Sequence, residues 1–300
     1  TVTKITDVNF PGNQTPALTI TGTFAHLDGF ACIMDTTGTI AVSDINSVTA
    51  WTASSTVDAA TYPDQGIACL RWKRYIIGFG TESMEFFRNA GSTPCPLERV
   101  TEMAQNVGAV AATAIAQIAD HVFFVGSTPQ GGLSVFRWNG ELSRISTPEI
   151  DALLLLAGSG NIIVTTMRDS GLSFVLVTGG GTTYCYILEE KFWFQMNGPA
   201  ILWTKCAGQS LGTAQDTYAI SSLSTKGKVW RINPSSRSFQ DDALAYSATA
   251  QFDTVDPGKG AMTLYHEAQI QADVESGTSN LDLDWSDDDY ATYSSVRTLD

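Results

Sequence analysis

Short strand-like runs recur along this chain in a fixed order, and the recurrence limits the possible folds more than any other feature. In each unit an apolar strand is followed, after a turn, by a strand that alternates polar and aromatic residues. The apolar strands are expected at residues 30–34, 76–79, 122–125, 174–177 and 218–220, and their partners at 40–43, 85–88, 135–138, 183–187 and 229–232. Equivalent positions in the partners, Ser43, Arg88, Arg137, Tyr186 and Arg231, lie 45, 49, 49 and 45 residues apart.

A period of this length with several short strands per unit is typical of the blades of a β-propeller. A third, more polar strand is expected in most units, around residues 51, 98–100, 143–145, 193–195 and 238–239. One blade cannot bury both faces of its sheet, and a ring of blades can. The sequence therefore predicts an all-β fold, a β-propeller of five or six blades with a C-terminal β segment. A β-sandwich with irregular hairpins is the alternative.

The texture of the sequence changes after Asp242, which suggests two regions. Residues 1–243 are expected to form the propeller, about five blades with the first incomplete. Residues 244–300 form an acidic β segment with strands near 246–252, 263–274 and 280–285, either a closing blade or a truncated second β domain. Helical periodicity is almost absent, with an Ala-rich exception at residues 107–119. Because Thr1 opens the chain and Asp300 lies in a strand-like run, we expect a longer gene product.

Charge is distributed unevenly, and this bears on possible partners. The net charge is −14, and residues 241–300 contribute −11 of it, with thirteen Asp or Glu against Lys259 and Arg297. No cluster of Lys and Arg suited to gripping phosphates is present. We therefore expect no tight binding of nucleic acid, although DNA could slide past the protein. No signal peptide or membrane-spanning run is found, so no membrane anchor is expected.

An acidic run near the C-terminus offers the strongest candidate site. Closely spaced carboxylates suit Ca²⁺, which makes Asp284, Asp287 and Asp288, with their neighbours Asp282 and Asp289, weak metal candidates. The Gly and Glu of an EF-hand loop are missing. The run is also similar to the Asp-box hairpin, a structural turn, with Tyr290 in place of its Gly and Tyr293 in place of its Trp. The residues assigned to this structural turn are Ser286, Asp288, Thr292 and Tyr293.

Catalytic constellations are not recognisable, so we expect no catalytic residue, no cofactor and no enzyme activity. The histidines at 26, 121 and 266 share no motif. Glu82, Glu85 and the Glu189–Glu190 pair could serve a glycosidase, but solvated strand ends explain them as well. The run Gly179-Gly180-Gly181 lacks the Lys and helix of a phosphate loop and predicts a hairpin turn.

Five cysteines and the recurring tryptophans complete the residues with possible chemistry. The cysteines lack a Cys-x-x-Cys pair, and most lie in or beside apolar runs, which favours core thiols and assembly in a reducing host cytoplasm. Tryptophans recur in the second or third strand of the units, where they could form a sugar-binding rim or fill wedges between blades. These tryptophans are Trp138, Trp193, Trp203 and Trp230.

Several segments resemble one known family, the phage stabilisation proteins of short-tailed bacteriophages. The clearest are Gly78 through Gly91, Val122 through Gly126 continuing to Gly140, and Arg144 through Thr147. Asp28-Gly29-Phe30 and Val42 through Trp51 match in the same order. Leu283 through Asp288 is similar to the family's Trp-Ser-Asp-Asp-Gly-Gly segment, with Asp289 and Tyr290 replacing the glycines. The resemblance extends from about residue 24 to about 297.

The resemblance implies a structural virion protein of the phage neck or tail. Such a tail hub, or head-closure protein, assembles on the portal and adaptor ring, usually as a hexamer. It extends or closes the DNA channel, retains packaged DNA, and anchors the tail needle and tailspikes. The competing functions are a carbohydrate-binding, receptor-binding β-propeller tail module and a propeller hydrolase acting through Glu85.

Overall fold

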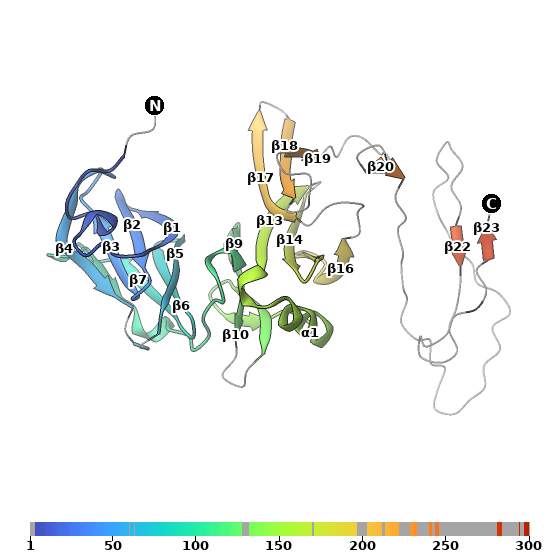
Figure 1. The fold of residues 1–300 in the computed structure, drawn as a ribbon, viewed down its shortest axis with the longest axis horizontal. Helices are drawn as coiled ribbons and strands as arrows, with labels where there is room; N and C mark the ends of the chain where they lie inside the picture. The colour runs from blue at the N-terminus through green and yellow to red at the C-terminus, as the bar shows by residue number, and fades with distance from the viewer. Residues whose placement is uncertain are drawn as a thin grey trace. The chain divides into compact units, whose positions relative to one another are not determined.

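The fold is built almost entirely of antiparallel β-sheet (Figure 1). This computed structural model describes residues 4–59, 61–62, 64–127, 132–169 and 171–196. Beyond residue 196 it describes the backbone of seven short strands and residue 294. The chain divides into two compact units, Thr1–Tyr246 and Ser247–Asp300. Each unit is considered by itself.

The described part of the first unit contains four four-stranded sheets and one three-stranded sheet, each an up-and-down meander in chain order. The first sheet comprises β1 (Ile20–Leu27), β2 (Phe30–Asp35), β3 (Thr39–Ser43) and β4 (Trp51–Asp58). The second comprises β5 (Gly66–Trp72), β6 (Tyr75–Gly80), β7 (Met84–Asn89) and β8 (Leu97–Arg99). The third comprises β9 (Ile115–Ile118), β10 (His121–Ser127), β11 (Leu133–Trp138) and β12 (Leu142–Arg144). The fourth comprises β13 (Ile163–Asp169), β14 (Leu172–Gly179), β15 (Thr182–Ile187) and β16 (Phe192–Met196), and the fifth β17 (Trp203–Leu211), β18 (Ala214–Ser221) and β19 (Val229–Ile232).

Helices are few in the described residues and lie between the strands. A single α-helix, α1 (Pro148–Ala157), precedes the fourth sheet, and Thr147 caps it by accepting a hydrogen bond from Ile150 N. Short 3-10 turns occupy Pro11–Asn13, Thr101–Met103, Ala112–Ala114 and Ser159–Asn161. Two-stranded pairs follow: β20 (Gln240–Asp241) with β21 (Leu244–Ala245), and, in the second unit, β22 (Leu281–Leu283) with β23 (Arg297–Leu299). None of the described helices has the length and apolarity required to cross a membrane.

Tight turns connect the strands, as the turn residues predict. Gly180 and Gly181 join β14 to β15 with φ angles of 60° and 86°, values that favour glycine. Two central residues with positive φ match the right-handed twist of the strands that they connect. The hairpin predicted at Gly179-Gly180-Gly181 is therefore confirmed.

The hydrophobic core lies in layers between successive sheets rather than within one of them. Neighbouring residues of a strand point to opposite faces, so Ile76 and Phe87 pack toward the first sheet while Ile77 and Phe86 pack toward the third. In the third sheet Phe124 faces the second sheet and Phe123 faces the fourth. Sheets with two apolar faces need a neighbour on each side, which is the packing rule of a propeller.

The segment that connects the second sheet to the third passes so close to β6 and β10 that glycines at these contacts have no room for a side chain. A Cβ on Gly108 would lie 2.2 Å from Gly80 O, and one on Gly126 would lie 2.2 Å from Gly108 O. Both distances are far below van der Waals contact, and the obstructing atoms are backbone. Gly108 of the connecting segment thus packs directly against the end of β6 and against β10, and Ala109 N donates to Gly80 O at 2.9 Å.

Most predicted strands are confirmed, and two predictions about elements are wrong or incomplete. The apolar strands and their partners appear as β2/β3, β6/β7, β10/β11, β14/β15 and β18/β19. Each sheet also has a first strand that the repeat did not locate, namely β1, β5, β9, β13 and β17. The Ala-rich stretch 107–119 contains a 3-10 turn and β9 rather than a helix. The α-helix is instead formed by the apolar run that ends at Ala157.

Candidate functional site

The first strands of four sheets surround a hollow in the first unit. It encloses about 310 Å³ and is lined by Thr23 and Phe24 of β1, Cys69 of β5, Gln117 of β9 and Thr166 of β13, among others. Side-chain hydrogen bonds join neighbouring first strands: Cys69 N donates to Thr23 Oγ1 at 2.8 Å, and Thr166 Oγ1 donates to Gln117 O at 3.1 Å. None of the described residues that line it is charged, so they supply no acid–base pair.

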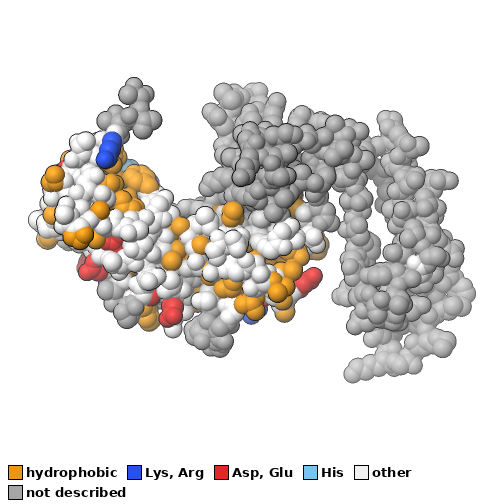
Figure 2. Space-filling view, in the orientation of Figure 1, with side chains coloured by type: hydrophobic (Ala, Val, Ile, Leu, Met, Phe, Trp, Pro, Cys, Tyr) orange, Lys and Arg blue, Asp and Glu red, His pale blue; other side chains and the backbone are white. Residues whose placement is uncertain are grey.

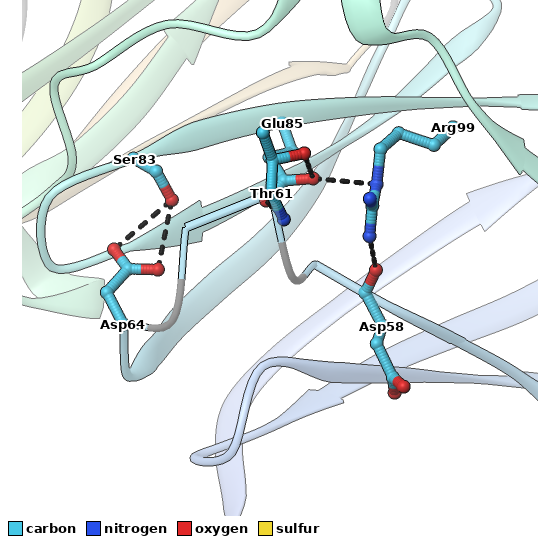
Figure 3. Close-up of polar contacts among 6 residues, drawn as sticks. All are labelled: Asp58, Thr61, Asp64, Ser83, Glu85 and Arg99. Atoms are coloured by element: carbon cyan, nitrogen blue, oxygen red, sulfur yellow. Dashed lines mark hydrogen bonds and ion pairs between the residues drawn. The ribbon is translucent and has the colours of Figure 1, made fainter.

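Glu85, the carboxylate considered for catalysis, is fully buried in the second sheet and occupied by structural partners (Figure 3). Thr61 donates its backbone N–H to Oε1 at 2.9 Å and its hydroxyl to Oε2 at 3.0 Å. Arg99 Nε lies 2.8 Å from Oε2, an ion pair in which the N–H is not aligned for a hydrogen bond. The expectation that Glu85 is a solvated strand end is therefore wrong.

The same network joins the first two sheets. Glu85 belongs to β7 and Arg99 ends β8, whereas Thr61 lies in the segment that leaves the first sheet. Arg99 Nη2 donates to the carbonyl of Asp58, the last residue of β4. A buried carboxylate requires a cation and hydrogen bonds to offset its desolvation. This network supplies both, and so Glu85 serves as a tie between sheets.

Asp64 makes a second tie beside the first, also drawn in Figure 3. Its carboxylate accepts a hydrogen bond from Glu82 N at 2.7 Å and bonds from Ser83 Oγ at 3.0 and 3.2 Å. Asp64 belongs to the segment that connects β4 to β5, whereas Glu82 and Ser83 belong to the turn between β6 and β7. Asp64 fixes the turn that carries Glu82, whose own side chain is exposed.

The remaining acidic and histidine candidates are not brought together. Glu189 is an exposed residue whose carboxylate accepts Ser173 N at 2.8 Å; although partial desolvation opposes it, this bonding holds its pKa below the usual value. His26 is exposed on β1, whereas burial and the nearby Arg137 lower the pKa of His121 on β10. His266 lies outside the described residues. No group of three or more His, Cys, Asp or Glu among the described residues could hold a metal ion.

Tryptophans fill the spaces between sheets, as one of the two interpretations predicted. Trp138 is buried between the second and third sheets, edge-on to Trp72 at a centroid distance of 5.7 Å. Trp193 packs against the core between the third and fourth sheets and donates Nε1 to Ile145 O at 2.8 Å. A sugar platform needs exposed rings, and Trp138 is only 3% exposed. The side chains of Trp203 and Trp230 lie outside the described residues.

Three cysteines gather in the core between the first two sheets. Cys32, Cys69 and Cys95 are buried thiols in one apolar cluster. Burial raises the pKa of Cys69 from 9.0 to about 12, and it raises those of Cys32 and Cys95 as well. These thiols are core residues, as the sequence predicted, because a reactive cysteine needs a low pKa and access to solvent.

The acidic run near the C-terminus lies almost wholly outside the described residues. Of the candidate metal and turn residues, Asp282 alone falls in a described strand, β22, where it pairs with Thr298 of β23. The run from Asp284 to Tyr293 connects these two antiparallel strands along the chain. The structural turn at Ser286, Asp288, Thr292 and Tyr293 and the weak metal candidates Asp284, Asp287 and Asp288 stay predictions.

Basic side chains are sparse on the face of the described residues shown in Figure 2. Among the exposed basic residues that the structure describes, Lys73 and Arg88 are each paired with an acidic residue, Asp120 at 3.7 Å and Glu98 at 3.0 Å. A surface that grips phosphates would instead gather unpaired Lys and Arg.

The described residues thus present layered sheets tied by buried polar networks, without an assembled catalytic group among them. Over residues 3–200 the chain matches a family of bacteriophage β-propeller proteins, which makes it a structural protein of a phage virion. The family is described as "Bacteriophage P22 Gp10, beta-propeller", and the chain belongs to it. The match confirms the resemblance and the propeller fold class; five or six blades stay a prediction.

Other comparisons give little beyond the family. No curated protein matches the chain. Among solved structures the chain is similar to BamB from Moraxella catarrhalis, with 15% sequence identity and a TM-score of 0.41. The similarity covers 71% of this chain and 64% of that one, so the chain spans less than two thirds of the BamB structure.

Proposed function

We propose that the protein is a tail hub in the neck of the virion. It binds the portal–adaptor complex, extends or closes the DNA channel, retains the packaged genome, and anchors the tail needle and tailspikes. The observation that carries the proposal is the family match over residues 3–200 of a chain whose matched region folds into stacked antiparallel sheets.

Rigidity of the matched region supports a role in assembly rather than in chemistry. Continuous apolar layers separate the first four sheets, and the ties at Glu85 and Asp64 fix the segments between the first two. Close-packed interiors resist deformation. A protein that holds a tail to a pressurised head needs this property, and it needs no substrate pocket.

The charge of the chain supports a position beside DNA without specific binding. A net charge of −14 repels the phosphate backbone, and the absence of a basic cluster from the sequence removes the usual means of gripping it. DNA that must leave the head quickly should meet a wall to which it does not adhere. In this proposal the protein lines or prolongs the channel.

A closed ring, most simply a hexamer, is the proposed assembled form. Symmetric rings are made by repeating one interface between copies, and each stable contact should bury more than about 1,000 Å². Assembly takes place in the host cytoplasm, where the buried thiols of Cys32, Cys69 and Cys95 stay reduced.

Mass photometry and electron microscopy of the purified full chain, with and without a portal–adaptor complex, test the proposal. We expect a ring of copies seated on the complex and, when purified tail needle or tailspike is added, that protein bound at the distal side of the ring. A portal ring without its adaptor is the control and should recruit less protein. A chain that stays monomeric and ignores the portal–adaptor complex would refute the hub assignment.

A further inference from the structure

The first sheet has an apolar face that no other described sheet covers. Its residues Cys32, Met34, Ile40 and Val42 face the second sheet. The alternate residues Ala31, Ile33 and Ala41, together with Trp51, form a separate buried cluster on the opposite face. The second and third sheets bury both of their faces against neighbouring sheets. Here the covering element is the N-terminal segment, residues 5–19, which we call the strap.

Apolar contact holds the strap on this face. Ile5 and Phe10 pack against the cluster, and the ring of Phe10 meets Trp51 edge-on at a centroid distance of 5.3 Å. Ala31 and Ala41 have short side chains, which leave room for the larger strap residues. Trp51 is only 4% exposed as a result. The face therefore forms a shallow seat with one tryptophan at its edge.

Polar contacts to the backbone of Trp51 give the seat its specificity. Asp7 Oδ2 accepts the N–H of Trp51 at 3.0 Å, and Asn9 Nδ2 donates to the carbonyl of Trp51 at 3.0 Å. The backbone N–H and the carbonyl of Trp51 are thus both hydrogen-bonded to strap side chains, those of Asp7 and Asn9. Charged acceptors make the stronger hydrogen bonds of this kind.

Within itself the strap is preorganised to present these groups. Asp7 Oδ1 accepts Asn9 N at 2.8 Å, so one carboxylate shapes the turn and binds the sheet. Asn13 Nδ2 donates to the carbonyls of Ile5 and Asp7 at 3.0 and 2.8 Å. A ligand that is already shaped loses less conformational entropy when it binds. The side chain of Val8 points away and is 75% exposed.

We propose that this face of the first sheet is a peptide-binding site for a segment of the form Asp-x-Asn-Phe, and that its ligand is the strap of the same chain. The strap takes the place that a neighbouring sheet would otherwise hold. Its seat is smaller than the layers between the first four sheets, having four buried apolar residues against eleven or twelve. The strap should therefore be released more easily than any of the first four sheets is separated from its neighbour.

Hydrogen exchange in the full-length protein tests the contacts directly. Phe10→Ala and Asp7→Ala should each raise the exchange rate of the Trp51 amide at least about tenfold, because Asp7→Ala removes the acceptor of that amide and Phe10→Ala removes the apolar contact that holds the strap on the sheet. Val8→Ala is the matched control in the same segment and should leave that rate unchanged. Equal protection of Trp51 in all three variants would overturn the proposal.

A synthetic peptide of residues 4–19 tests whether the seat is a binding site. Added to a chain that begins at residue 20, it should restore the protection of Trp51, whereas a peptide with Phe10→Ala should not. The intact chain should not bind the labelled peptide, because its own strap fills the seat. Equal binding to the intact and shortened chains would contradict occupation by the strap. If the shortened chain does not fold, the exchange rates of the point variants decide.

Discussion

At the scale of single residues, the buried carboxylate of Glu85 makes a sharp prediction. Glu85→Ala removes the anion that faces Arg99 and leaves two Thr61 donors without an acceptor. Breaking a buried ion pair on one side is strongly destabilising. Because Arg99 keeps 27% exposure, we expect a loss of about 3 kcal/mol in unfolding free energy, measured by urea denaturation.

Glu98→Gln supplies the matched control for Glu85→Ala. Glu98 pairs with Arg88 at 3.0 Å, but the two side chains are 53% and 58% exposed. Exposed pairs contribute little, so the change in unfolding free energy should stay within about 0.5 kcal/mol. Equal effects of the two variants would mean that Glu85 is not the tie described above.

Cys69 predicts a dependence of stability on alkaline pH. Its pKa rises from 9.0 to about 12 on folding. Above pH 9 the unfolded chain loses the thiol proton while the folded chain retains it, so stability falls as the pH rises. The loss should develop between pH 9 and 12, at up to about 1.4 kcal/mol per pH unit for one such group. Below pH 9 this contribution is constant.

Comparison of the wild-type chain with Cys69→Ala checks this dependence. Thermal unfolding followed from pH 8 to pH 10.5 should show a shallower decline in the variant, because one of the three thiols buried between the first two sheets is gone. Identical slopes in the two proteins would contradict the burial of this thiol in the folded state.

The sequence predicted that the cysteines are buried, but it did not predict that Glu85 is buried. A cysteine within apolar residues is read as core from its immediate neighbours. The burial of Glu85 depends on Thr61 and Arg99, which lie 24 positions before and 14 positions after it. No local pattern indicates that these partners meet, so a solvated strand end was the natural expectation.

At the scale of elements, the glycines between sheets predict where a single methyl group is not tolerated. Gly108→Ala would place Cβ 2.2 Å from Gly80 O and 2.4 Å from the Thr81 carbonyl carbon. Backbone cannot move aside cheaply, so we expect a loss of stability of about 2–3 kcal/mol, visible as a lower melting temperature. Gly160→Ala is the control, because its Cβ meets nothing within 4 Å. Equal melting temperatures for the two variants would contradict the close approach.

The strands were predictable where their patterns are strong. Apolar runs such as β10 and β14 and their hairpin partners follow from composition and turn residues. The first strands were missed because they mix Thr, Gly, Ala and Gln with apolar residues, as in the Ile-Ala-Gln-Ile of β9. Their extended conformation is stabilised by the ladder hydrogen bonds to the second strand of each sheet. Tertiary packing likewise decides that residues 107–119 are not helical.

At the scale of the whole molecule, the charge predicts behaviour toward DNA. With a net charge of −14 and no basic cluster in its sequence, the full chain should not retard double-stranded DNA in a gel at micromolar protein and 50 mM salt. A basic protein of similar size is the positive control. Salt-sensitive binding in the micromolar range would refute the proposed non-adhering channel wall.

The sequence carried the fold class and the family, because both reside in repeats and in motifs that occur in order. Partner surfaces are a different matter, since they depend on a second molecule that the chain does not encode. The contact between the strap and the first sheet shows the same limit of sequence-based prediction within one chain. Its residues Asp7, Asn9 and Phe10 form no recognisable motif until Trp51, more than forty positions later, gives them a counterpart.

The layers between sheets also determine how the molecule carries mechanical load. Compression that pushes one sheet toward the next meets close-packed side chains such as Phe79 against Phe124, whose ring centroids are 5.1 Å apart, and such interiors are barely compressible. Tension that separates the sheets is resisted chiefly by dispersion contacts and by the few ties such as Asp64 to Ser83. The layered sheets therefore resist compression toward one another more strongly than they resist being pulled apart. Internal pressure that squeezes the sheets together is the load that this architecture withstands best.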